Sequence, residues 1–120
     1  MHIREIKKED NAQIESVIRS VFMELNLPLV GTAYADPETS MMFEAYDVPR
    51  SVYFVVESEG KILGGAGIKP LKNYVETVCE LQKMYALPKM RGQGLGHKLM
   101  ACCLDAARAF GFEKCYLETI

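Results

Sequence analysis

The sequence has no surplus of either charge, no basic cluster and no long apolar run. Fourteen Lys and Arg stand against 16 Asp and Glu, so the net charge is −2 over 120 residues. This balance creates no positive field, and a nucleic-acid partner is not expected. No segment reaches the about 20 apolar residues of a membrane span, and the N-terminus lacks the apolar region of a signal peptide. We therefore expect a cytoplasmic protein without a membrane partner.

Cysteine and histidine are too scattered to predict a metal centre. The four cysteines are Cys79, Cys102, Cys103 and Cys115, and none of their spacings is that of a C-x-x-C pair. We expect them to be free thiols, as is usual in a reducing compartment. His2 and His97 stand apart from any cluster of ligand residues, so no metal is expected.

A strand and an amphipathic helix open the chain. Residues 2–6 predict the strand, and Asp10 and Gln13 have the spacing of a helix capping box. The helix behind them carries one apolar face, whose residues recur at intervals of three and four: Ile14, Val17, Ile18, Val21, Phe22 and Leu25. This face should pack against the core.

A shorter helix and a hairpin follow a loop at residues 27–35. Asp36 and Pro37 predict the start of this helix, which should run to about Tyr46. Residues 51–58 and 61–69 are two strand-like segments joined by a turn at Glu59-Gly60. The second segment contains Gly64, Gly65 and Gly67, which indicate a bulge or the close approach of another backbone.

The stretch from Val75 to His97 is the most informative part of the chain. Residues 75–87 predict a strand, Pro88 ends it, and RGQGLG at residues 91–96 leads directly into a helical pattern. The first N–H groups of a helix lack internal acceptors and lie at the positive end of its dipole. Glycines allow the backbone to turn tightly against a ligand. Together these features predict a cradle for a phosphate or diphosphate.

The spacing of the glycines argues against two kinds of nucleotide site. A dinucleotide fingerprint requires G-x-G-x-x-G, whereas here the glycines fall at 92, 94 and 96. The loop of ATPases and GTPases requires Gly-Lys-Ser/Thr, and this tripeptide does not occur. A nucleotide-binding regulator is therefore not the expected function.

The segment Arg91-x-x-Gly94-x-Gly96, between a strand and an amphipathic helix, resembles the R/Q-x-x-G-x-G/A signature of the GNAT superfamily of N-acetyltransferases. The resemblance implies an α/β (α+β) fold in the order β-α-α-β-β-β-α-β, with a mixed, mostly antiparallel sheet flanked by helices. Residues 113–120 are its last strand here. The family normally continues with a fourth helix and two more strands, so we expect 1–120 to be a single domain that is C-terminally truncated.

The resemblance implies acetyl-CoA as the acetyl donor. Main-chain N–H groups from Gly92 to Gly96 would bind its pyrophosphate, and Arg91 would either add charge or fix the loop. The pantetheine arm would pair with the end of the long strand, and the N–H of Ala86 would stabilise the developing oxyanion. The expected cofactor-binding residues are Tyr85, Ala86, Leu87, Arg91, Gly92, Gln93, Gly94, Leu95 and Gly96.

Glu80 is the candidate general base. It lies on the long strand six residues before Ala86, so alternation predicts that both face the same side of the sheet. The alternative is an acid that is satisfied by neighbouring polar groups. Tyr116 and Glu118 are further candidates. The tyrosine that often acts as general acid in the family lies on the fourth helix, beyond position 120.

The implied function is direct transfer of an acetyl group from acetyl-CoA to a primary amine in a ternary complex. The acceptor would be a small molecule or a peptide, and a homodimer is compatible with the resemblance. The alternative is a non-catalytic CoA-binding or interaction module of the same fold. An apolar set could line the acceptor groove or simply pack the short helix onto the sheet: Tyr34, Met41, Met42, Phe43 and Tyr46.

Overall fold

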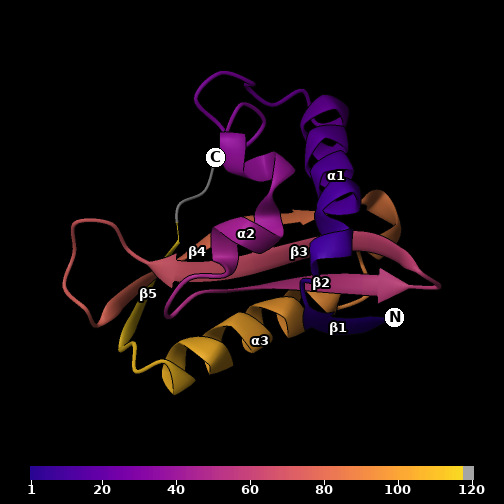
Figure 1. The fold of residues 1–120 in the computed structure, drawn as a ribbon. Coiled ribbons are helices and arrows are strands. Elements are labelled where there is room, and N and C mark those ends of the chain that lie inside the picture. Colours follow the sequence, from indigo (N-terminus) through magenta and orange to yellow (C-terminus); the bar gives the residue numbers. More distant parts are fainter. Residues whose placement is uncertain (118–120) are drawn as a thin grey trace.

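A computed structural model describes residues 1–117, and it places one five-stranded sheet between two helical layers (Figure 1). The strands are β1 (His2–Glu5), β2 (Val52–Ser58), β3 (Lys61–Pro70), β4 (Val78–Ala86) and β5 (Lys114–Leu117). The helices are α1 (Asn11–Glu24), α2 (Met42–Tyr46) and α3 (Leu95–Ala109), with short 3-10 helices η1 (Lys8–Asp10), η2 (Pro37–Ser40) and η3 (Pro88–Met90). In Figure 1, α1 and α2 cover one face of the sheet and α3 covers the other.

The sheet is mixed and mostly antiparallel. Its strands lie in the order β1-β2-β3-β4-β5, and all neighbours are antiparallel except β4 and β5, which are parallel. A parallel pair needs a crossover connection, which α3 supplies between the end of β4 and the start of β5. The predicted fold class and element order are confirmed over the described residues.

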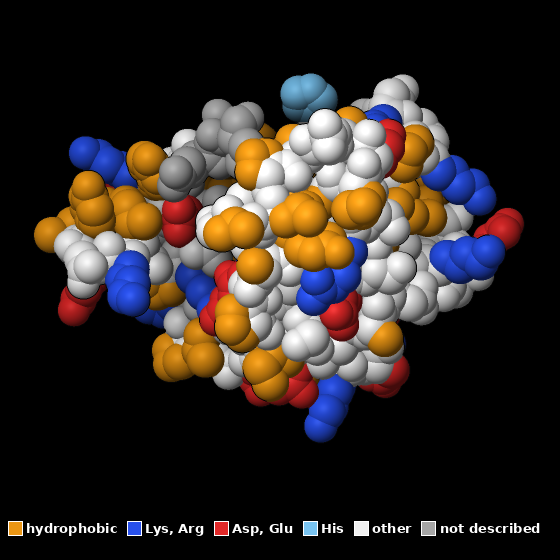
Figure 2. Space-filling model, turned by 90° about the horizontal axis from the view of Figure 1, so that it is seen from above, with side chains coloured by type: hydrophobic (Ala, Val, Ile, Leu, Met, Phe, Trp, Pro, Cys, Tyr) orange, Lys and Arg blue, Asp and Glu red, His pale blue; other side chains and the backbone are white. Residues whose placement is uncertain are grey.

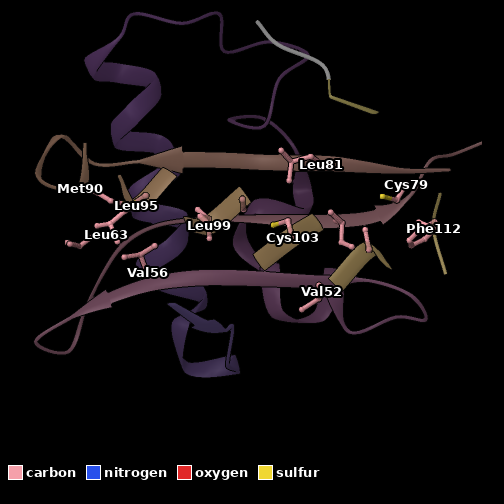
Figure 3. Packing of buried hydrophobic residues seen from close by; sticks show 13 residues of the cluster. Val52, Val56, Leu63, Cys79, Leu81, Met90, Leu95, Leu99, Cys103 and Phe112 are labelled. Carbon is pink, nitrogen blue, oxygen red and sulfur yellow. The ribbon is translucent and has the colours of Figure 1, made fainter. Parts of the chain in front are cut away.

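Each face of the sheet carries its own hydrophobic core. On the α3 side, Leu95, Leu99 and Cys103 point toward the sheet and share a buried cluster with Val56 and Leu81 (Figure 3). On the other side, the α1 stripe is buried as predicted with residues of β2 and α2, in a cluster that holds Ile14, Val17, Ile18, Val21, Phe22, Met42, Tyr46, Tyr53 and Val55. The exception is Leu25 at the end of α1, which is 50% exposed.

The predicted capping box at Asp10 and Gln13 is wrong. The Asp10 side chain makes no bond to the start of α1; it accepts the Lys7 N–H at 2.7 Å and pairs with Arg4 at 2.7 Å. Gln13 is occupied elsewhere, because its Oε1 accepts the Ile62 N–H at 2.9 Å. Both side chains therefore connect α1 to strands.

The predicted helix from Asp36 to Tyr46 begins as expected but is split in two. The Asp36 carboxylate accepts the Glu38 N–H at 2.9 Å, and Pro37 follows as the first helical residue. Met41, with φ of −142°, then separates η2 from α2. The start of α2 is instead held by Asn11, whose side-chain oxygen accepts the Phe43 N–H at 2.8 Å. This contact between residues 32 positions apart has no local signature in the sequence.

A bulge interrupts β4 near its end. Gly67 faces Gln82 and Gly65 faces Tyr85, so two residues of β4 oppose one residue of β3. Lys83 takes up the extra length with a φ of 49°, and its carbonyl accepts the buried Tyr53 hydroxyl at 2.7 Å. The glycines of β3 allow this close packing, because a Cβ on Gly65 would lie 2.5 Å from the Tyr53 ring. The predicted irregularity at these glycines is thus confirmed.

The cysteines are free thiols, as the sequence predicts. All four cysteines are free, and burial raises the pKa of Cys79 and of Cys103 to about 12. Both thiols therefore stay protonated near neutral pH. Within residues 1–117, none of the helices has the length and apolar character needed to cross a bilayer.

Candidate active site

The glycine-rich turn takes the shape that the sequence predicts. After η3, Gly92 and Gly94 adopt left-handed backbone conformations with φ of 78° and 73°, and α3 begins at Leu95. The first main-chain bond into this helix runs from the Lys98 N–H to the Gly94 carbonyl at 3.3 Å. The preceding N–H groups of the first turn have no acceptor within the helix. They are available to an anionic ligand.

The third glycine of the motif has a different role. Gly96 lies inside α3 without a positive φ, and a Cβ added to it would make ordinary contact with Met84 Cε at 3.7 Å. The fold therefore does not require glycine at position 96, whereas the left-handed conformations at positions 92 and 94 favour it.

Arg91 fixes the turn against two other elements. Its Nε and Nη2 donate to the Ala86 carbonyl at 3.1 and 2.9 Å. Its Nη1 and Nη2 also bind both carboxylate oxygens of Glu24, at 2.8 and 2.7 Å, and hydrogen bonding to this guanidinium lowers the pKa of Glu24. Of the two roles predicted for Arg91, these contacts favour holding the loop.

Within residues 1–117, the end of β4 has one edge without a strand partner. The Leu87 N–H donates to the Leu63 carbonyl of β3 at 2.8 Å. Because successive N–H groups of a strand point to opposite edges, the Ala86 N–H points away from β3. Among the described residues, β5 pairs with β4 only as far as Leu81, opposite Leu117. The Ala86 N–H therefore faces a side where the described chain provides no strand partner.

Two clefts meet along this edge, and both are lined by Met84, Tyr85, Ala86 and Arg91. One, of about 560 Å³, continues over the glycine turn to Gly92, Gly94, Gly96 and His97. The other, of about 470 Å³, continues toward Val21, Leu25 and Leu27. The structure thus joins the predicted turn and the predicted strand end in one open groove. Figure 2 shows that the upper face of the molecule mixes apolar, acidic and basic groups.

Glu80 lies in an adjoining pocket of about 820 Å³, which we call the Glu80 pocket and which shares Leu81 and Lys83 with the second cleft. Residues of β4, of η2 and of the loop before it line this pocket: Gly31, Thr32, Ala33, Ala35, Asp36, Glu38, Glu80, Leu81, Gln82 and Lys83. Lys83, whose side chain is 9% exposed, bridges Asp36 at 3.0 Å and Glu38 at 3.2 Å. Burial alone would raise the pKa of Asp36, but the Glu38 N–H and the Lys83 ammonium outweigh it and lower that pKa.

The prediction that Glu80 and Ala86 share a face is wrong. Glu80 bonds to Gln82, which bonds to Tyr46 on the α1–α2 side, whereas the Ala86 side chain packs against the α3 cluster. The bulge at Lys83 is the reason, because an extra residue reverses the alternation of the strand beyond it. Tyr85 consequently faces α1, where its ring lies 5.4 Å from that of Phe22 and burial raises its pKa.

The apolar residues proposed for an acceptor groove belong mainly to the core. Met42 and Tyr46 are 0% and 3% exposed and pack under α1. None of the five residues lines the Glu80 pocket. The packing alternative therefore holds for Met42 and Tyr46. Tyr116 lies on β5 in register with Glu80 and is 48% exposed, while Glu118 falls outside the described residues.

Sequence reasoning missed four polar residues around Glu80, namely Asp36, Glu38, Gln82 and Lys83. The alternation of Glu80 and Gln82 along β4 was the one available signal, since it places both side chains on one face. The approach of Asp36 and Glu38 depends on the path of the loop, which carries no periodic pattern. No group of three or more His, Cys, Asp or Glu side chains suited to a metal occurs within residues 1–117.

Comparison with known proteins identifies the family of this chain. A family profile described as the acetyltransferase (GNAT) family matches residues 19–120. An Escherichia coli K12 protein named "Uncharacterized N-acetyltransferase YjgM" is 44% identical over 118 residues, which is 98% of this chain and 71% of that protein.

Solved structures share the fold. A GNAT-family acetyltransferase of Staphylococcus aureus Mu50 matches with a TM-score of 0.84 and 20% identity, over 99% of this chain and 72% of its own. A GNAT-family acetyltransferase of Brucella melitensis, solved in complex with acetyl-CoA, matches with a TM-score of 0.73 and 24% identity. The match covers 99% of this chain and 75% of that chain. The profile and the Escherichia coli relative show that this chain belongs to the acetyltransferase (GNAT) family, a family of acyltransferase enzymes.

Proposed function

We propose that this protein transfers the acetyl group of acetyl-CoA directly to a primary amine in a ternary complex. The observation that carries the proposal is the groove from the first N–H groups of α3 at the Gly92–Gly96 turn to the Ala86 N–H on β4, which has no strand partner within residues 1–117. A diphosphate suits the positive end of a helix, and a chain with amide groups suits an unpaired strand edge. Acetyl-CoA contains both parts.

The residues of the groove would divide the binding of acetyl-CoA between them. Backbone groups of Gly92, Gln93, Gly94, Leu95 and Gly96 hold the diphosphate, with Arg91 fixing the turn. Tyr85, Ala86 and Leu87 present the strand edge to the pantetheine arm. The Ala86 carbonyl accepts from Arg91, and the Ala86 N–H is the donor that would bind the thioester oxygen. Such a donor contributes roughly 3–4 kcal/mol to a transition state with oxyanion character.

Glu80 would accept the proton that the amine must lose. A free amine with a pKa of about 10.4 is mostly protonated at pH 7, and removing that proton costs roughly 4 kcal/mol. Because Glu80 and Ala86 lie on opposite sides of the bulge, the proton would pass through water in the Glu80 pocket. The amine nitrogen bonds to the carbonyl carbon, the carbon–sulfur bond breaks, and the CoA thiolate leaves and takes up a proton.

Calorimetry with acetyl-CoA and CoA, followed by an assay of thiol release with a panel of primary amines, tests the proposal. The panel should contain amino sugars, polyamines and lysine-bearing peptides. We expect Glu80→Gln to lower kcat by roughly 10²-fold or more at pH 7, and the loss to shrink at high pH, where the amine is deprotonated without a base.

Glu76→Gln is the matched control, because Glu76 is an exposed carboxylate in the turn just before β4. It should keep the wild-type rate. Binding of acetyl-CoA without thiol release on any amine would support the non-catalytic CoA-binding alternative instead. Equal rates for Glu80→Gln and wild type across the pH range would exclude Glu80 as the base.

A further inference from the structure

A chain of two hydrogen bonds ends on Glu80. The Tyr46 hydroxyl donates to Gln82 Oε1 at 2.8 Å, and Gln82 Nε2 donates to Glu80 Oε1 at 2.7 Å. Gln82 and Glu80 are two residues apart on β4, so they share a face of the strand, and Tyr46 reaches them from the end of α2. The chain thus runs from the buried core to the open pocket.

Tyr46 is held in the core as a neutral hydroxyl. It is 3% exposed, and burial raises its pKa well above the usual range for tyrosine. Its ring lies 5.1 Å from that of Tyr53, and the Lys69 ammonium lies 4.6 Å from its centroid. These contacts fix the ring, and therefore the position from which its hydroxyl reaches Gln82.

The Glu80 carboxylate sets the orientation of the Gln82 amide. A carboxylate only accepts, so the amide nitrogen faces Glu80 and the amide oxygen is left to accept from Tyr46. The reverse orientation would place the amide oxygen against the Glu80 carboxylate, where two acceptors repel. The Tyr46 hydroxyl anchors the other end of the amide, and a donor held in this way restricts the rotamers of Glu80.

We propose that Gln82 is a positioning residue for Glu80, and that Tyr46 anchors the Gln82 side chain. The proposal rests on the proposed function, in which Glu80 accepts the amine proton. Gln82 itself does not exchange a proton with the substrate. It keeps the Glu80 side chain aimed into the pocket that the acceptor amine enters.

Other charged or titratable groups also face Glu80. These groups come from the start of η2, from α2 and from strands β3, β4 and β5. They are Asp36, Glu38, Tyr46, Lys69, Lys83 and Tyr116. Lys83 is paired with both Asp36 and Glu38, and Lys69 with Glu38 at 3.2 Å. The Gln82 amide makes the direct bond to the Glu80 carboxylate.

A double-mutant cycle tests the assignment, with rates measured on acetyl-CoA and the best amine of the panel. Gln82→Leu alone should lower kcat at pH 7 by about tenfold, the loss expected for one hydrogen bond to a charged group. It should leave the calorimetric affinity for CoA unchanged. In the Glu80→Gln background the same substitution should have no further effect on kcat, because the group on which Gln82 acts has gone.

The split between kcat and KM separates positioning from a general loss of structure. Gln82→Leu should lower kcat and leave the KM for the amine unchanged, because Gln82 aims Glu80 without contacting the substrate. Tyr46→Phe should lower kcat by less, since Gln82 keeps its own bond to Glu80.

The outcomes distinguish the two proposals. Should Glu80→Gln keep wild-type activity, the base assignment fails and the positioning role fails with it. Should Glu80→Gln be impaired while Gln82→Leu costs the same factor in both backgrounds, Glu80 remains the base and Gln82 has only a structural role. A raised KM for the amine with an unchanged kcat in Gln82→Leu would also overturn the positioning role.

Discussion

The two halves of β4 differ in what lies beside them. From Val78 to Leu81 the strand is paired with β3 and with β5, and Cys79 and Leu81 are buried. From Lys83 to Ala86 it contains a bulge and, within the described chain, pairs with β3 alone. Side chains from this second half line all three clefts described above. The groove therefore forms where strand pairing stops, and its main donors are backbone groups.

Proline at position 86 gives the largest expected effect. Ala86→Pro removes the N–H that points away from β3, so it deletes the proposed oxyanion donor and leaves the ladder to β3 intact. We expect kcat to fall by roughly 10²–10³-fold, with a small change in the free energy of unfolding. Thiol-release kinetics and urea unfolding measure the two effects.

Leu87→Pro is the matched control for that substitution. The φ of Leu87 is −64°, which suits proline, but its N–H donates to Leu63. This variant should lose stability through the broken bond and lost packing while keeping the Ala86 N–H. If Leu87→Pro lowered kcat per folded molecule as much as Ala86→Pro, the distinction between the two edges of β4 would fail.

Valine at position 94 should give the next largest effect, on ligand affinity. Gly94→Val and Gly60→Val place a side chain at nearly equal positive φ, 73° and 78°, and neither Cβ meets another atom within 4 Å. In both variants, backbone strain should lower the free energy of unfolding by a similar amount, about 1–2 kcal/mol. Only Gly94→Val should weaken CoA binding, by roughly 100-fold, or about 2.7 kcal/mol. Equal CoA affinity of the two variants by calorimetry would contradict the diphosphate site.

Lys83, at the bulge of β4, should make a pH-dependent contribution to the free energy of unfolding. Lys83 helps to hold the pKa of Asp36 below its usual 3.8. A depressed carboxyl pKa stabilises the fold fully above the usual value, and this stability disappears as the pH falls through the folded-state pKa. Lys83→Met should therefore lower stability by a constant amount above about pH 5 and by progressively less below pH 4. Urea unfolding at several pH values checks this, and a pH-independent difference would contradict it.

Glu24→Gln should have the smallest effect on the affinity for CoA, and the direction of that effect distinguishes the two roles of Arg91. If Arg91 mainly fixes the turn, loss of its carboxylate partner should loosen the turn and weaken CoA binding by about two- to threefold. If Arg91 mainly supplies charge, the freed guanidinium should strengthen binding. We expect the weaker binding. Calorimetry at low and high salt measures the difference, because a charge effect is screened by salt.

The sequence predicted most of the fold because its signals are local. The apolar stripe of α1, the turn at Glu59-Gly60 and the Gly92–Gly94 turn each result from a few neighbouring residues. The element order follows from them, whereas the role of Ala86 beside the glycine turn was implied by the family resemblance. These predictions needed no knowledge of distant contacts.

The unpredicted features depend on contacts between distant parts of the chain. Lys83 is held in its bulge by Tyr53, 30 residues earlier, and its ammonium binds Asp36, 47 residues earlier. A lysine with positive φ has no intrinsic preference for that conformation. The Glu80 pocket, and the reversal of alternation that separates Glu80 from Ala86, could therefore not be read from β4 alone.

A crystal structure of the complex with CoA tests the central claim most directly. The account predicts diphosphate oxygens about 3 Å from main-chain nitrogens between Gly92 and Gly96, and the pantetheine arm along Tyr85 to Leu87. A carrier bound at another surface, with these main-chain groups left in water, would contradict it.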